Sequence, residues 1–204
     1  MLLNRQCTVV HMTDYFAGDS RSNRERMLAG DLYIADDAES AGIAIRAAQL
    51  ADRYHRSWLN EDPEARDLLV QLLGALGEGA EVKPPLSVDY GENTFIGAGT
   101  FVNFNLTALD VARITIGEDC QIGPNVQLLT ATHPVDPVPR RARLEGSTPI
   151  TIGNNVWLGG GVIVCPGVTI GDNSVIGAGA VVTKDIPADV VAVGNPARVI
   201  RAVS

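Results

Sequence analysis

The chain has 204 residues, of which 46% are hydrophobic and 20% are charged, a composition that supplies one folded core and argues against long disorder. Its net charge of −8 argues against nucleic acid as a main partner, because phosphates repel an acidic protein. No apolar run approaches the roughly 20 residues that span a bilayer, and the three cysteines show neither a disulfide pattern nor zinc-ligand spacing, so we expect a cytoplasmic protein that binds no metal and no membrane.

The first residues, MLLNRQCTVVHM, are mildly apolar but contain Asn4, Arg5 and Gln6. No small-residue cleavage site follows them, as a signal peptide requires. We expect residues 1–20 to form an extension of unknown role, with Met12 as an alternative start.

A first helix is predicted from Asp36 to about Leu59, within an N-terminal helical segment over residues 21–80. Asp36 and Glu39 have the spacing of a box that caps a helix N-terminus. Apolar residues then recur at helical spacing and form one face. These residues are Ile43, Ala47, Leu50, Tyr54 and Trp58.

A second helix is predicted from Asp62-Pro63 to a glycine stop at Gly77. Five leucines lie at helical spacing between these ends, so both helices have an apolar face. We expect the two helices to pack as a hairpin.

After Pro84-Pro85 the pattern changes to aliphatic residues at every sixth position. The longest unbroken series is Ile152, Leu158, Val164, Ile170, Ile176 and Val182. A period of six fits neither an α-helix nor a hairpin sheet and is typical of a β-helix. Each six residues form a short strand and a turn, and three such units form one triangular coil of about 18 residues that stacks on the next. We therefore predict a mainly β fold, a parallel β-helix over residues 81–204.

The period breaks over residues 129–149, which contain four prolines and a cluster of arginines. These residues cannot continue the coil, so we expect a loop that projects from it. Long loops on rigid scaffolds commonly carry function.

Several segments resemble a known family. The run ITIGNNVWLGGGVIVCPGVTIGDNSVIGAGAVVTKDIP resembles the left-handed β-helix acyltransferases of hexapeptide repeats. The segments RERMLAGDLY, DYGENTFIG, NFNLTALD, TATHPVDP and VGNPARVIR resemble its maltose and galactoside O-acetyltransferase branch, and the resemblance covers about residues 22–201. It implies a homotrimer with active sites between neighbouring subunits, each moving acetyl from acetyl-CoA to a sugar hydroxyl.

Acetyl transfer to a hydroxyl needs a base, and histidine is the usual one. His11 lies in the extension, and His55 lies on the first predicted helix, where a solvated surface role is expected. His133, in the projecting loop, matches the family's catalytic histidine and is the expected general base. Glu145, in the same loop, is a candidate to orient His133, although it suits an ion pair with a neighbouring arginine equally well.

The resemblance also assigns Asn103, which matches a family asparagine that contacts the acceptor and helps to stabilise the transition state. An asparagine at a coil turn equally suits left-handed backbone angles. Cys165 has no adjacent histidine and no cationic neighbour, so direct transfer is favoured over an acyl-cysteine intermediate.

Carboxylates and amides bind sugar hydroxyls, and Asp36 and Asp89 occupy the positions of acceptor contacts in the galactoside enzyme. That enzyme has a serine at the second position, and Asp36 equally suits the helix cap. Asp110 is a further candidate, followed by Val111 where the galactoside enzyme has a second aspartate. Specificity for galactosides is therefore not implied.

Seven residues match positions that bind acetyl-CoA in the family. These are Trp157, Gly160, Ala178, Thr183, Lys184, Arg198 and Arg201. Cations outnumber acids over residues 176–204, which suits phosphates, although cations on a C-terminal segment are commonly just solvated. Gly160 replaces a serine of the galactoside enzyme, so one side-chain hydrogen bond is missing there.

Other readings remain open. A non-catalytic β-helix scaffold is one alternative, but a scaffold would not need His133 and Asn103 together. A carbonic-anhydrase-like enzyme is another, but it would need several zinc-binding histidines in the coil region, where only His133 lies. The same acetyl transfer to a Nod-factor-type oligosaccharide, an antibiotic or an amine is a third reading. The helical hairpin with AGDLY favours a sugar hydroxyl.

Overall fold

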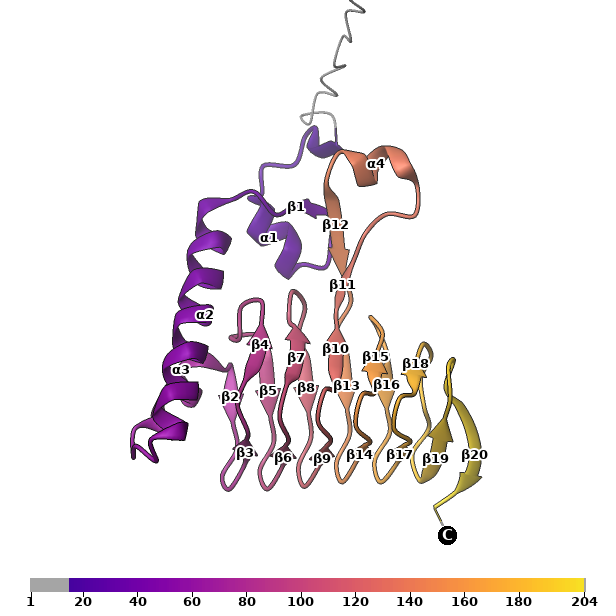
Figure 1. Cartoon of the computed structure of the whole chain (residues 1–204). Helices are drawn as coiled ribbons and strands as arrows, with labels where there is room; N and C mark the ends of the chain where they lie inside the picture. Colours follow the sequence, from indigo (N-terminus) through magenta and orange to yellow (C-terminus); the bar gives the residue numbers. More distant parts are fainter. Residues whose placement is uncertain (1–14, 204) are drawn as a thin grey trace, which may run out of the picture.

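The structure is a computed structural model that describes residues 15–203. Figure 1 shows a β-helix of short strands, with α-helices at its N-terminal end and an arm that projects from one side. Most of the predicted extension over residues 1–20, with His11 and Met12, lies outside the described residues. Between residues 15 and 203, no helix has the length and apolar character needed to cross a membrane.

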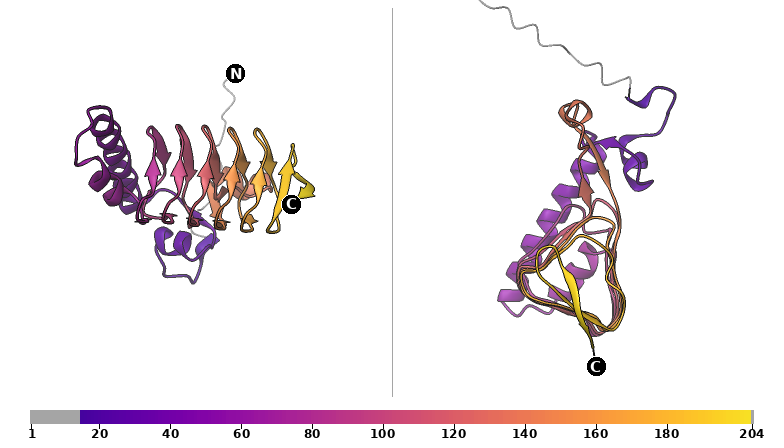
Figure 2. Two further views of the ribbon diagram at one scale, coloured as in Figure 1. Left: turned by 90° about the horizontal axis from the view of Figure 1, so that it is seen from below. Right: turned by 90° about the vertical axis from the view of Figure 1, so that its right-hand side faces the viewer.

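The β-helix is a triangular prism whose three sides are parallel sheets, seen end-on in the right panel of Figure 2. The first face contains β2 (Ala75–Leu76), β5 (Thr94–Ile96), β8 (Ile114–Ile116), β13 (Ile150–Ile152) and β16 (Thr169–Ile170). The second face contains β3 (Glu81–Val82), β6 (Phe101–Val102), β9 (Gln121–Ile122), β14 (Trp157–Leu158) and β17 (Val175–Ile176), and ends with β19 (Val190–Val193) and the antiparallel β20 (Arg198–Ala202). The third face contains β4 (Leu86–Val88), β7 (Leu106–Leu109), β10 (Gln127–Leu129), β15 (Ile163–Val164) and β18 (Val181–Val182).

Aliphatic side chains of the six-residue repeat fill the interior of the prism. The register stacks Ile116 on Ile152 and Leu128 on Val164, and these side chains are at most 1% exposed. Corner residues such as Asn155 have positive φ angles, here 53°, as a sharp turn between two faces requires. The predicted mainly β fold, built on a period of six, is confirmed.

The helical hairpin covers the N-terminal end of the β-helix (Figure 1). It consists of α2 (Ala38–Leu59) and α3 (Ala65–Leu72), preceded by α1 (Asn23–Leu28). Leu50 and Tyr54 of α2 and Leu68 of α3 are buried in the same cluster as the first coils. The predicted hairpin is therefore confirmed.

The boundaries of this hairpin differ from the prediction. Asp37, not Asp36, caps α2, because its side chain accepts a hydrogen bond from the Ser40 N–H at 2.7 Å. Helix α3 is preceded by Glu64, which makes no side-chain cap bond, and ends at Leu72 instead of Gly77. Strand β2 pairs with β5, so sheet pairing replaces the last predicted helical turns, and the β-helix begins before residue 81.

Residues 129–149 form a structured arm and not an irregular loop. Strand β11 (Ala131–Thr132) pairs antiparallel with β12 (Leu144–Ser147), and the short helix α4 (Pro137–Arg141) connects them. Strand β12 also pairs with β1 (Tyr33–Ile34) from the N-terminal segment. The arm leaves between β10 of the third face and β13 of the first, so it projects from the corner opposite the second face.

Candidate functional site

The arm carries the histidine that the sequence singles out. His133 directly follows β11 and is exposed. Because Thr132 lies opposite Gly146 on β12, the same register carried on by one residue brings His133 opposite Glu145. No hydrogen bond joins these two side chains in the described part of the chain. The arm therefore aligns the two predicted residues without linking them.

Glu145 has a partner that the sequence did not predict. The Tyr33 hydroxyl donates to its Oε2 at 2.8 Å, from the position directly opposite on β1. Tyr33 is only 1% exposed, and burial followed by the hydrogen bond to Glu145 raises the pKa of its hydroxyl, which stays a donor. Tyr33 belongs to the AGDLY segment, but no other signal marks it, because its partner lies 112 residues later.

A second carboxyl group, Asp89, follows β4 near this cluster and is partly buried. Burial, together with the charges of Asp110 and Glu145, raises its pKa to about 6. The carboxyl group of Asp89 therefore changes charge just below neutral pH.

Asp110 is a structural residue, which corrects its predicted role as an acceptor ligand. Its side chain is fully buried, and its carboxylate accepts hydrogen bonds from the backbone N–H groups of Tyr90 at 2.8 Å and Asn93 at 3.2 Å. The Asp89 N–H at 3.1 Å and the Thr94 hydroxyl at 3.0 Å complete the set. Buried carboxylates need such donors. Asp110 thus shapes the turn that carries Asp89 and has no exposed oxygen for a ligand.

Asp36 is exposed and is fixed from α1. The Asn23 side-chain amide donates to its Oδ1 at 2.9 Å, and the Asn23 Oδ1 accepts from the Ile34 N–H at 3.2 Å. Asn23 in turn receives a 3.3 Å hydrogen bond from the guanidinium of Arg26, which is 6% exposed.

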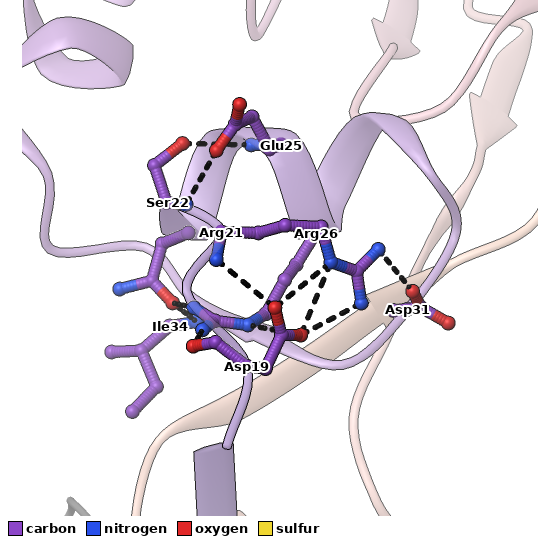
Figure 3. Close-up of polar contacts among 8 residues, drawn as sticks. Asp19, Arg21, Ser22, Glu25, Arg26, Asp31 and Ile34 are labelled. Carbon is purple, nitrogen blue, oxygen red and sulfur yellow. Dashed lines mark hydrogen bonds and ion pairs between the residues drawn. The ribbon is translucent and has the colours of Figure 1, made fainter. Parts of the chain in front are cut away.

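Figure 3 shows the polar network that holds Arg26. The Asp19 carboxylate lies 2.7 Å from Arg21 and 3.1 Å from Arg26. Hydrogen bonds from Arg21, and then from Arg26, hold the pKa of Asp19 well below its usual range. Through Arg26 the network reaches Asn23, whose side chain contacts both the Ile34 N–H and Asp36, before and after the turn that follows β1.

A groove of about 450 Å³ lies on the second face, along its corner with the third. It gathers four residues that the sequence assigned separately: Asn103, Trp157, Gly160 and Ala178. Trp157 is 56% exposed on β14, and the small residues follow strands at the same corner of successive coils. The groove is therefore an apolar track with accessible backbone, which suits a long, flexible ligand.

The side chain of Asn103 is free to act in this groove. Its Oδ1 accepts a hydrogen bond from the Phe104 N–H at 2.8 Å, and its Nδ2 makes none among the described residues. Asn105, two positions later, takes the left-handed backbone angle of the turn, with φ of 64°. A left-handed backbone angle therefore does not account for Asn103.

The four remaining predicted ligand-binding residues fall on two sides of the prism. Arg198 and Arg201 lie on β20, at the C-terminal end of the second face, and hydrogen-bond backbone carbonyl groups beside them. Thr183 and Lys184 follow β18 and are exposed. They precede the bridge between Ile186 and Ile170, so they lie at the same corner as the arm.

One chain thus carries two half-sites at different places on the prism. We call the arm half-site the set of His133, Glu145, Asp89, Thr183 and Lys184. We call the groove half-site the set of Asn103, Trp157, Gly160, Ala178, Arg198 and Arg201. The arm projects from the corner opposite the second face, so the chain does not bring its own two half-sites together.

Neither half-site contains a metal cluster or a thiol. Among residues 15–203, no three His, Cys, Asp or Glu side chains are grouped as metal ligands would be. Cys120 is buried, and burial raises the pKa of its thiol. Cys165 is partly exposed and does not line the groove, but it directly follows β15 and lies beside Thr183 of the next coil, at the arm corner. The side chains named in the two half-sites offer acid–base and hydrogen-bonding groups.

Two family descriptions match this chain. Residues 149–184 match "Bacterial transferase hexapeptide (six repeats)", and residues 26–77 match "Maltose acetyltransferase hexapeptide capping motif". The second match coincides with α1 and the helical hairpin.

Known proteins resemble the chain over most of its length. Nodulation protein L of Rhizobium meliloti (strain 1021) is 49% identical over 181 residues, which cover 88% of this chain and 98% of that protein. A maltose O-acetyltransferase from Clostridium difficile 630 superposes with a TM-score of 0.88 at 42% identity, covering 91% of this chain and all of that one. A galactoside acetyltransferase in complex with coenzyme A gives a TM-score of 0.86 at 43% identity, covering 90% and 92%.

These matches span the helical cap, the coils and the arm together. With the repeat, they show that this chain belongs to the hexapeptide-repeat acetyltransferases and is an enzyme of the galactoside and maltose O-acetyltransferase type.

Proposed function

We propose that the protein transfers the acetyl group of acetyl-CoA to a hydroxyl of a sugar. The observation that carries this proposal is the groove, which collects Asn103, Trp157, Gly160 and Ala178 from three different coils. A related galactoside acetyltransferase was solved with coenzyme A, which supports the same ligand here. The pantetheine chain of CoA follows the backbone at Gly160 and Ala178, and Trp157 packs against this chain.

His133 is the general base of this reaction. Its imidazole accepts the hydroxyl proton while the acceptor oxygen bonds to the thioester carbon. The carbon–sulfur bond then breaks, and the imidazolium returns the proton to the CoA sulfur, which leaves as the thiol. The free Nδ2 of Asn103 donates to the oxyanion that forms between these steps. Glu145, fixed by Tyr33, orients His133, and Asp89 and Asp36 accept hydrogen bonds from the sugar.

The active site is composite and forms between copies of the chain in a homotrimer. The arm and Lys184 occupy one corner of the prism, and the groove occupies another. Cyclic symmetry repeats one contact around three subunits, so the arm of each copy meets the groove of the next. Lys184 then joins Arg198 and Arg201 of a neighbour around the phosphates of CoA.

The test is thiol release from acetyl-CoA by the purified protein with glucose, maltose, a thiogalactoside and several amines as acceptors. We expect turnover with a sugar, and we expect His133→Ala to lower kcat by about 10²–10⁴ while acetyl-CoA still binds. Val135→Ala is the matched control, because this residue is 91% exposed on the same arm. A His133→Ala variant that keeps most of its turnover would rule out the base, and a protein that binds no acetyl-CoA would be a scaffold.

A further inference from the structure

A second pocket lies where the helical hairpin meets the first coil, outside both half-sites. It measures about 340 Å³, within the range of about 300–1,000 Å³ typical of small-molecule sites. Helices α2 and α3 form one wall, and strand β3 with Lys83 after it forms the other. Neither the fold nor acetyl transfer to a single sugar ring requires this pocket.

The walls of this pocket combine an aromatic surface with charged groups. Trp58 is 38% exposed at the end of α2 and meets Phe104 edge to face, with 6.3 Å between ring centroids. The side chains of Asp62, Glu81 and Lys83 line the pocket and make no hydrogen bond or ion pair with another group between residues 15 and 203. Free donors and acceptors around an aromatic wall suit a sugar ring, whose face carries C–H groups and whose edge carries hydroxyls.

One wall of the pocket is held in place from both sides. The Arg66 guanidinium donates to the carbonyl oxygens of Ala80 at 2.8 Å and Gly77 at 2.9 Å, so α3 is tied to the corner before β3. The Tyr54 hydroxyl also donates to the Val82 carbonyl oxygen. The pocket is therefore preformed, and a ligand does not have to open it.

Lys83 connects this pocket to the groove half-site. Its Nζ lies 4.9 Å from the centroid of the Phe104 ring and 5.3 Å from that of Phe101, which lines the groove beside Asn103. Strand β3 is one coil before β6, so the pocket adjoins the Asn103 end of the groove and not the end near Ala178.

We propose that the pocket lined by Trp58, Asp62 and Lys83 is a second carbohydrate subsite, which binds the next ring of a linear oligosaccharide acceptor. This inference rests on the proposed function, because the reacting hydroxyl must lie at Asn103. It narrows the acceptor class from single sugars to oligosaccharides. The far ring stacks on Trp58, and its hydroxyls bond to Asp62 and Lys83.

The kinetic test compares glucose with maltotriose, and N-acetylglucosamine with its β-1,4-linked trimer. For the trimer that the enzyme accepts, we expect Trp58→Ala to raise the KM about tenfold. The kcat and the KM for the corresponding single sugar should not change. Asp62→Asn, at an exposed position that does not endanger folding, should raise the same KM about threefold. Leu59→Ala is the matched control, because Leu59 is 62% exposed on α2 but does not line the pocket. Equal effects of Trp58→Ala on trimer and single sugar would overturn the proposal.

A binding test separates this proposal from acetyl transfer itself. Trp157→Phe leaves Trp58 as the sole tryptophan of the chain, so its fluorescence reports on the pocket without acetyl-CoA. Saturation by a trimer at least tenfold tighter than by the single sugar supports the subsite, even if no acetyl group moves. No response to either trimer overturns the subsite, and turnover on a single sugar then leaves the proposed function intact.

Discussion

The arm half-site and the groove half-site are built in opposite ways. The arm half-site consists of acid–base side chains, and Tyr33 and Glu145 hold it through one pairing between distant strands. The groove half-site includes Gly160 and Ala178, which offer backbone along the groove, and the six-residue repeat sets the spacing of these two residues. Changes at His133 on the arm should therefore act on the chemical step, whereas changes at Gly160 and Ala178 along the groove should act on binding. The proposed composite site also predicts that a chain with one inactive half-site can be complemented by a chain whose other half-site is inactive.

The largest expected effect comes from combining two inactive variants. Asn103→Ala alone should lower kcat by about 10²–10³, because it removes an oxyanion donor, and His133→Ala should be comparably impaired. If the half-sites of two chains form each site, coexpression in equal amounts should restore about a quarter of the sites in random trimers. Thiol release measures the recovery.

The matched control for Asn103→Ala is the single variant Asn105→Gly. Asn105 lies at the same corner but has a φ of 64°, which glycine adopts freely, so Asn105→Gly alone should stay active. Mixed trimers of the two inactive variants that remain as inactive as their parents would contradict the composite site.

A smaller effect is expected for the cation at the arm corner. Lys184→Ala should raise the KM for acetyl-CoA by about tenfold, since it removes one charge-assisted hydrogen bond to a phosphate. The KM for the sugar should change much less. Arg53→Ala, which removes an exposed cation from α2, provides the matched control. A larger change in the sugar KM would mean that the two ends of the site are exchanged.

The repeat could be predicted from the sequence, because each coil obeys the same local rule of one inward aliphatic residue and one turn. Gly160 and Ala178 follow from this rule together with the resemblance, and the groove contains both. The Tyr33–Glu145 pair could not be predicted, because it depends on β1 reaching β12 across more than half of the chain. Asp110 was misassigned for a similar reason, since four donors from one turn satisfy its carboxylate only after folding.

The stability of the protein should also depend on the charge of Asp89 in the arm half-site. Burial, with Asp110 and Glu145 nearby, raises the pKa of Asp89 from 3.8 to about 6, so the native state binds more protons than the unfolded state between these values. The free energy of unfolding therefore falls as pH rises from about 4 to 6. Asp89→Asn should stabilise the protein by about 1 kcal/mol at pH 7, after allowance for solvent screening, and have little effect below pH 4.

Urea unfolding at pH 4, 5 and 7 measures this difference. Glu118→Gln, at an exposed turn of the β-helix, is the control for loss of a carboxylate and should show no such slope. A stabilisation by Asp89→Asn that is the same at all three pH values would show that the Asp89 charge is not its cause.

The smallest expected effect is a gain at the groove. A Cβ atom at Gly160 would lie 3.4 Å from the Pro124 carbonyl oxygen, which is ordinary contact, whereas Gly161 has a φ of 70° and does not favour a side chain. Gly160→Ser therefore fits, and its hydroxyl should lower the KM for acetyl-CoA about threefold, the value of one net hydrogen bond. Gly161→Ser should instead lower the free energy of unfolding by about 1 kcal/mol. Because Gly160 lies along the groove and not at the reacting atoms, kcat should not change. A higher KM for acetyl-CoA in Gly160→Ser would show that acetyl-CoA does not bind along this part of the groove.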